Sequence, residues 1–467
     1  MACLIRHPSP YPPETRLLTT FPTLLLVSLM ASALDDGPAT ELKYSGSVAQ
    51  LDRGTPKEPS KRFEAYCLLI NGDSRDLAFF VSEQGSGAWA WPERFGRVRF
   101  DADQAAVGKS GMKLLYTHDG TKYPHVLRLP LFPKADRLKE GASWVDGKRR
   151  FEITRTRKVA GRDCWQIEVS NNFGRNETLW VERNTPLVVK SERRLFMGRG
   201  DQFVLTMELE SAKTVDNAQL TKLKPPVQTL LKLHSALNRA ENETKPELNA
   251  AQLKTAKAAA VVLAEQSSKT AFQPLATAIG RDVALQLERL GGIAALAKKF
   301  VGQKSPALTL TGLDGKAMST KETTGRIVVL HFWDYRGDPL TEPYGQVGYL
   351  DFFNLQSSRR KFDVKVVGVA VDPRLGDRTQ KSAALRSIRK LQTFMNISYP
   401  IAIDDGALLR KFGDPQRLGA KLPLWVVLDS TGKIVHYKSG FYDIKPDEGL
   451  RELEAVVVGL VRKQRGK

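Results

Sequence analysis

The part of the chain from about residue 41 to residue 215 alternates apolar and polar positions with a period of two. The pattern is clearest in RFEITRTRKV, DCWQIEVSN, NETLWVER, PLVVKSERRLF and QFVLTMELES. Such a period places successive side chains on opposite faces of a strand. Turn sequences such as AGRD, NFGRN and RNTP separate the segments. The pattern predicts an antiparallel β-rich domain over residues 41–215, built as a half-barrel or a meander.

The next part, residues 217–300, is rich in Ala, Leu, Lys and Gln, with apolar positions at helical spacing. The segments VQTLLKLHSAL, AAQLKTAKAAAVVLAEQ and DVALQLERLGGIAALAKKF show this spacing. We expect Pro225-Pro226 to open the first helix and Gly291-Gly292 to break the last. The sequence predicts a helical linker domain.

The last part, residues 304–467, mixes continuous apolar strands with amphipathic helices. GRIVVLHFW and VKVVGVAVD are typical of strands that are buried on both faces of a sheet. Helical segments follow each of them, and LPLWVVLDSTGKIVHYKSG is typical of a hairpin. His331 lies inside the first strand, where we expect a hydrogen-bonded residue of the core or of a sheet face. The order β-α-β-α-β-β-α predicts an α/β domain, and the whole chain is an α+β multidomain protein.

The N-terminus has the pattern of an export signal. An apolar stretch from Phe21 to Met30 is too short for a comfortable membrane span, and Ala31-Ser32-Ala33 fits a small-x-small cleavage site. We expect residues 1–33 to be removed and the protein to be exported, to the periplasm or outside the cell. The alternative is an N-terminal membrane anchor. Because no later segment has about 20 continuous apolar residues, a multi-span membrane protein is excluded.

Charge and cysteine content narrow the function. The net charge is +20, but residues 301–467 contain 27 basic and 18 acidic residues, so the excess is spread along the chain. A nucleic-acid site would concentrate it, so we expect no nucleic-acid partner. Cys67 and Cys164 are the only cysteines after the signal. They are interpreted either as a disulfide or as two buried thiols. No metal-ligand spacing or phosphate loop is present, so no cofactor is expected.

The C-terminal part resembles the thioredoxin-fold superfamily, in the version shared by peroxiredoxins (alkyl hydroperoxide reductase, thiol-specific antioxidant) and membrane-linked thiol-disulfide oxidoreductases. The entry strand PALTLTGLDGK, the core strands VVLHFW and VVGVAVD, and the segment LPLWVVLDSTGKIV are similar to the family's landmarks. The resemblance implies that Leu422-Pro423 carries the cis-proline that faces the active site in this fold.

The resemblance stops at the reactive sulfurs. In the family, Phe-Trp is followed by Cys-x-x-Cys at a helix start, where the thiol pKa is lowered. Here the two cysteine positions are Gly337 and Leu340. The dithiol chemistry is absent, and whether any enzymatic activity remains is left open. The resemblance still implies a groove beside the proline, lined by Tyr335, Arg336, Asp338, Pro339, Leu422 and Pro423.

The β-rich part resembles exported lipoprotein-carrier half-barrels over about 60 residues, through the order strand, AGRDCW, strand, TLWVERNTPLVVK. That resemblance implies an apolar ligand in a groove walled by Trp165 and Trp180. Three functions are therefore weighed. The first is a redox-inactive binding or scaffold protein of the cell envelope with a protein or peptide partner. The others are a thiol-disulfide oxidoreductase or peroxiredoxin-like antioxidant protein, and a lipid or lipoprotein carrier.

Overall fold

The computed structural model describes residues 37–72, 75–101, 105–107, 111–318, 325–334, 342–442, 444 and 449–466, without the side chains of 342–345. The predicted export signal lies outside the described residues. The chain forms two compact units. The first unit consists of the chain up to His234 together with the short segment Arg239–Lys245. The second unit consists of Ser235–Asn238 and Pro246–Lys467. Among the described residues, no helix combines the length and apolarity that crossing a membrane requires.

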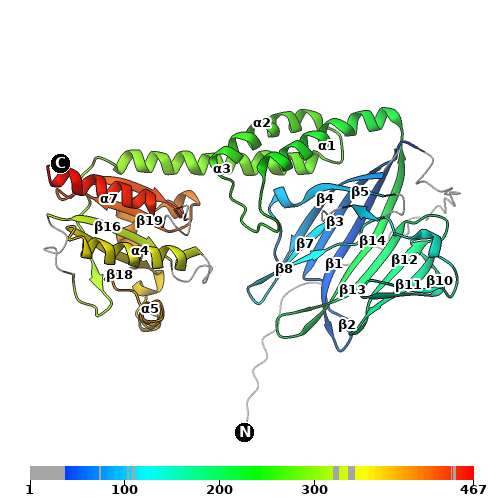
Figure 1. Cartoon of the computed structure of the whole chain (residues 1–467), viewed down its shortest axis with the longest axis horizontal. Helices are drawn as coiled ribbons and strands as arrows, with labels where there is room; N and C mark the ends of the chain where they lie inside the picture. Colours follow the sequence, from blue (N-terminus) through cyan, green and yellow to red (C-terminus); the bar gives the residue numbers. More distant parts are fainter. Residues whose placement is uncertain are drawn as a thin grey trace, which may run out of the picture. The chain divides into compact units, whose positions relative to one another are not determined.

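The first unit contains a large antiparallel sheet (Figure 1). Its strands, within the described residues, are β1 (Ala39–Asp52), β2 (Thr55–Pro56), β3 (Lys61–Ile70), β4 (Arg75–Gly85), β5 (Phe95–Phe100), β6 (Ala106–Val107), β9 (Ser143–Asp146), β10 (Arg149–Val159), β11 (Arg162–Asn171), β12 (Gly174–Glu182), β13 (Val188–Met197) and β14 (Asp201–Val215). The order is β6-β5-β4-β3-β1-β14-β13-β12-β11-β10-β9, with β2 paired to β1. Most neighbours in the sheet are consecutive in the chain, which confirms the predicted antiparallel β-rich domain.

A second hairpin packs its side chains into the core of this sheet. It consists of β7 (Lys113–His118) and β8 (Thr121–Val126). Met112, Leu114 and Tyr116 join Trp180 in one apolar cluster, and Trp165 belongs to another. Both tryptophans are therefore buried in packed clusters, which is the arrangement of a filled core.

The disulfide between Cys67 and Cys164, which the sequence left open, is not formed. Both thiols are free and buried. Cys67 lies on β3 and Cys164 on β11, and the sheet places β1, β14, β13 and β12 between these strands. A disulfide requires the two Cα atoms to lie within about 7 Å, and neighbouring strands are already about 4.8 Å apart. The alternative, two buried thiols, is the one the structure adopts.

Three helices follow, and two local expectations about them are wrong. They are α1 (Asn217–Leu237), α2 (Ala250–Gln266) and α3 (Gln273–Phe300). Pro225 and Pro226 lie inside α1 and do not open it. Buried leucines on both sides of the prolines, Leu220 and Leu230 among them, hold the helix through packing. Gly291-Gly292 does not break α3.

The second unit carries a mixed sheet. Its strands are β15 (Thr311–Gly312), β16 (Ile327–Trp333), β17 (Val364–Val371), β18 (Ile401–Asp404), β19 (Leu424–Leu428) and β20 (Ile434–Ser439). The order is β15-β18-β17-β16-β19-β20. Strands β16, β17 and β18 are parallel, whereas β19 and β20 run antiparallel. Its helices are α4 (Glu342–Arg359), α5 (Lys381–Phe394), α6 (Ala407–Lys411) and α7 (Arg451–Gln464).

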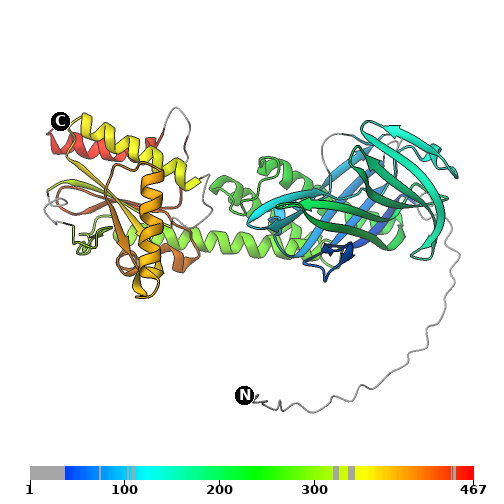
Figure 2. The same cartoon turned by 90° about the horizontal axis from the view of Figure 1, so that it is seen from below.

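Helices cover both faces of this sheet. On one face, Leu350 of α4, Ile388 of α5 and Val457 of α7 pack on the odd-numbered residues of β16. Helices α4 and α7 lie together on the same side of the sheet (Figure 2). The other face packs on α6 and on the last turns of α3, where Phe300 stacks on Tyr437 with ring centroids 5.6 Å apart. The long helix α3 is thus part of this unit's core.

Candidate functional site

Only part of the predicted groove lies within the described residues. Tyr335, Arg336, Asp338 and Pro339, together with the cysteine positions Gly337 and Leu340, lie outside the described residues. Leu422 and Pro423 are described, immediately before β19, and the Leu422–Pro423 peptide bond is cis. The cis bond that the sequence predicted is therefore present. Phe332 of β16 pairs with Leu424 of β19, so this proline lies beside the carboxyl end of β16.

A small pocket opens at this place. Its volume is about 20 Å³. Its lining comes from β16 and the residue after it, from α4, and from the segments before β19 and after β20. The lining residues are His331, Trp333, Asp334, Gln346, Leu422, Pro423 and Phe441. A cavity of this size holds about one water molecule. The structure thus brings Leu422 and Pro423 together with His331, a residue that the sequence placed in the core.

His331 is the unusual member of this lining. Its side chain is 1% exposed, and its ring stacks on the indole of Trp425 with centroids 3.9 Å apart. Neither Nδ1 nor Nε2 has a hydrogen-bond partner among the described residues. The expected hydrogen bond of His331 is therefore not formed within the described part of the chain, although Asp334 and Gln346 line the same pocket. Burial lowers the pKa of His331 to about 3, so the imidazole is neutral near pH 7.

Hydrogen bonds fix one wall of the pocket. The Gln346 side chain on α4 donates to the Tyr442 carbonyl oxygen over 2.8 Å and accepts from the Tyr442 N–H over 3.2 Å. The Tyr442 hydroxyl and His436 Nε2 lie 2.8 Å apart. The segment that includes Phe441 is therefore held against α4. Both ends of the Gln346 amide are occupied by backbone groups, whereas both ring nitrogens of His331 are without a hydrogen-bond partner among the described residues.

The two cysteines contribute no reactive sulfur to this site. Cys67 and Cys164 belong to the other unit. Burial raises the pKa of Cys164 to about 12 and raises that of Cys67 further. Cys67 donates a weak hydrogen bond to Met112 Sδ over 3.5 Å. A thiol with a raised pKa is a poor nucleophile, so these cysteines have the character of packing residues.

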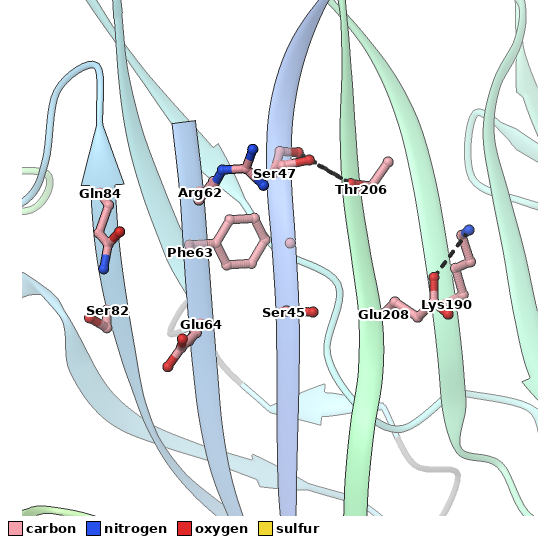
Figure 3. A pocket seen from close by; sticks show the side chains of 11 residues that line it. Ser45, Ser47, Arg62, Phe63, Glu64, Ser82, Gln84, Lys190, Thr206 and Glu208 are labelled. Carbon is pink, nitrogen blue, oxygen red and sulfur yellow. Dashed lines mark hydrogen bonds and ion pairs between the residues drawn. The ribbon is translucent and has the colours of Figure 1, made fainter. Parts of the chain in front are cut away.

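The first unit has a polar hollow of its own, about 370 Å³ in volume, over β1 (Figure 3). Ser45 and Ser47 form its floor, between longer side chains on the neighbouring strands. Lys190 pairs with Glu208 over 3.2 Å, and the Ser47 and Thr206 hydroxyls lie 3.0 Å apart. This lining is polar and does not match the predicted apolar groove, so an apolar ligand stays a prediction.

A set of metal-ligating atoms occurs in the first unit. His118 Nε2 and one oxygen each of Asp119 and Asp201 lie within 4.8 Å of one another. His118 and Asp119 lie at the tip of the β7–β8 hairpin, and Asp201 lies at the start of β14. The distance of 2.7 Å between His118 Nε2 and Asp201 is that of a charge-assisted hydrogen bond, which accounts for the contact without an ion.

Comparisons with known proteins found similarity for the second unit. The model of the AhpC/TSA family matches residues 301–437. Solved structures similar to this chain include a secreted disulfide oxidoreductase of Mycobacterium tuberculosis. The two sequences are 17% identical, the match covers 33% of this chain and 96% of that chain, and the TM-score is 0.25. A thiol:disulfide interchange protein of the thioredoxin family from Chlorobium tepidum has 15% identity, 34% and 97% coverage, and a TM-score of 0.25. No curated protein matches the chain.

The family match and the sheet order agree on the fold. The matched residues contain the parallel strands β16, β17 and β18, the antiparallel pair β19 and β20, and the cis-proline before β19. The sequence predicted β16, β17 and the antiparallel pair β19 and β20, whereas β18 and α6 were not among the expected elements. The C-terminal part of this chain is a thioredoxin-fold redoxin domain.

Proposed function

We propose that the redoxin domain is a protein-binding module that works without thiol chemistry. The observation that carries this proposal is the absence of cysteine from the domain, since none follows Cys164. Thiol-disulfide exchange proceeds through a thiolate and a mixed disulfide, and neither can form here. The oxidoreductase and antioxidant alternatives rest on the fold alone, and a fold does not imply a function.

The backbone beside the cis-proline supports peptide binding. Neither the N–H nor the C=O of Leu422 has a hydrogen-bond partner among the described residues. The next carbonyl, that of Pro423, accepts from the Gly440 N–H over 2.8 Å, so the segment is tied to the sheet on its far side. A backbone N–H and C=O without partners in the chain are the groups through which an added strand is bound. The bound partner is therefore an extended segment of another protein.

The setting of this module follows from the N-terminus. The signal-like residues 1–33 support export, and the protein would act as a scaffold in the cell envelope, soluble after signal cleavage. A lipid or lipoprotein carrier role of the β-rich unit is the second candidate. The buried positions of Trp165 and Trp180 favour the scaffold role, because a carrier needs such side chains to line an open groove.

Two measurements test the proposal. The mature protein should show no turnover of peroxide or insulin disulfide, next to a Gly337→Cys/Leu340→Cys variant as the control for the scaffold. An extended peptide selected from a random decapeptide library should slow hydrogen exchange at the Leu422 amide. Turnover by the parent protein would refute the absence of redox chemistry. A tight peptide that leaves Leu422 exchange unchanged would refute the binding mode.

A further inference from the structure

We propose that the pocket beside Pro423 is a subsite for one uncharged hydroxyl group, which hydrogen-bonds to His331. The inference rests on the proposed peptide-binding function and specifies which side chain the partner presents. The occupant is a serine or threonine of the bound segment.

The first step is the unused hydrogen-bonding capacity of His331. The ring is 1% exposed, and neither nitrogen has a partner among the described residues. A buried polar group without a partner costs about 1–3 kcal/mol. Stacking on Trp425 at 3.9 Å and on Trp333 at 6.1 Å holds the ring in place, so it cannot turn toward another part of the chain. The pocket opens directly beside the ring.

The second step is the charge of the occupant. Burial keeps the imidazole neutral at neutral pH. A neutral imidazole carries one N–H donor and one acceptor nitrogen. It therefore offers no counter-charge to a carboxylate or a phosphate, and Asp334 in the same lining would repel either group. Burying such an anion unpaired costs much more than burying a neutral group.

The third step is size. A volume of about 20 Å³ admits one water-sized group and excludes a carboxamide or a ring. A hydroxyl is the smallest group that both donates and accepts, so it suits either tautomer of His331. Leu422, Pro423 and Phe441 line the same pocket. A segment paired with the Leu422 backbone would therefore bring its side chains to the pocket.

The experiment uses the full mature chain and a host decapeptide selected on it, made in versions with Ser, Thr, Ala, Asp or Lys at the position that contacts the pocket. Ser and Thr versions should bind about tenfold more tightly than Ala, which is what one buried hydrogen bond contributes. The Asp version should bind more weakly than Ala. A Lys version that binds more tightly than the Ser version would show that Asp334 selects a cation, and would overturn the uncharged occupant. His331→Phe keeps the stacked ring and should abolish the Ser preference. His125→Phe, at a half-buried histidine of the other unit, should leave it intact.

The outcomes separate the two proposals. Equal binding of Ser and Ala versions, or a Ser preference that survives in His331→Phe, would overturn the hydroxyl subsite and leave peptide binding standing. Failure of every library peptide to bind would overturn both. If His331→Phe does not fold, the ¹⁵N shifts of His331 in the wild type decide the question. They should move when the Ala peptide is exchanged for the Ser peptide, and unchanged shifts would mean that water alone occupies the pocket.

Discussion

The imidazole of His331 stacks on the indole of Trp425 at a centroid distance of 3.9 Å and an interplanar angle of 22°. The two residues are cross-strand partners on β16 and β19. The contact joins the strand that precedes the family's reactive position to the strand that follows the cis-proline. It also fixes a neutral histidine at the floor of the pocket, which makes the stability of this domain depend on pH.

The pH dependence has a defined sign. The pKa of His331 is about 3 in the folded chain and about 6.5 when unfolded. Below pH 6.5 the unfolded state takes up a proton that the folded state refuses, so stability falls as the pH decreases from 6.5 toward 3. The slope is at most about 1.4 kcal/mol per pH unit. Hydrogen exchange of the β16 amides should report it, and His331→Phe should flatten it. An equal slope in both proteins would contradict the assignment.

A second prediction concerns the buried ion pair of the β-rich unit. Lys61 Nζ lies 2.8 Å from Glu83 Oε2, and both side chains are fully buried. Glu83 also accepts from the N–H groups of Trp89 and Leu115. Lys61→Met should destabilise this unit by about 3–5 kcal/mol, because it leaves a buried carboxylate without its counter-charge.

Urea unfolding of this unit measures the effect. The exposed pair of Arg62 and Glu58 is the matched control, and Arg62→Ala should cost about 1 kcal/mol or less. A Lys61→Met/Glu83→Leu double variant should recover much of the loss, since it removes both charges. A loss in the double variant as large as in Lys61→Met would show that packing, and not the unpaired charge, determines the cost.

A third prediction separates two adjacent glycines in α3. A Cβ at Gly291 would meet no atom within 4 Å, whereas one at Gly292 would lie 3.1 Å from Leu418 Cδ1. Gly291→Ala should stabilise the second unit by about 0.5–1 kcal/mol through helix propensity. Gly292→Ala should stabilise it less or destabilise it, because Leu418 must move. Thermal unfolding compares them, and equal shifts would mean that α3 does not pack on this segment.

A fourth prediction concerns the thiols. Cys67 and Cys164 are buried, and the pKa of each is raised, so both should resist alkylation in the native protein. Iodoacetamide at pH 7.5 followed by mass spectrometry should label neither thiol until denaturant is added. Labelling of Cys164 within minutes would indicate an accessible thiolate and would reopen a redox role for the β-rich unit.

Much of this protein could be predicted from local pattern. The order of apolar and polar residues sets both the period of two over residues 41–215 and the buried strands of the last part. This local order is enough to predict these elements, because a strand or helix must bury its apolar side wherever it folds. The cis-proline could be placed because LPLWVVLDSTGKIV carries a recognisable sequence. The loss of both family cysteines is a property of the sequence alone, and no fold can supply the missing sulfur.

Contacts between distant residues decided the rest. The free state of Cys67 and Cys164 depends on the four strands that lie between theirs in the sheet. The continuity of α3 through Gly291-Gly292 depends on packing against the redoxin domain, which outweighs the low helix propensity of glycine. His331 looked like an ordinary core histidine because its sequence neighbours are apolar. Only the fold shows that Trp425, Leu422 and Pro423 enclose it without offering a hydrogen bond, since burial and hydrogen-bond partners arise from residues about 90 positions away in the chain.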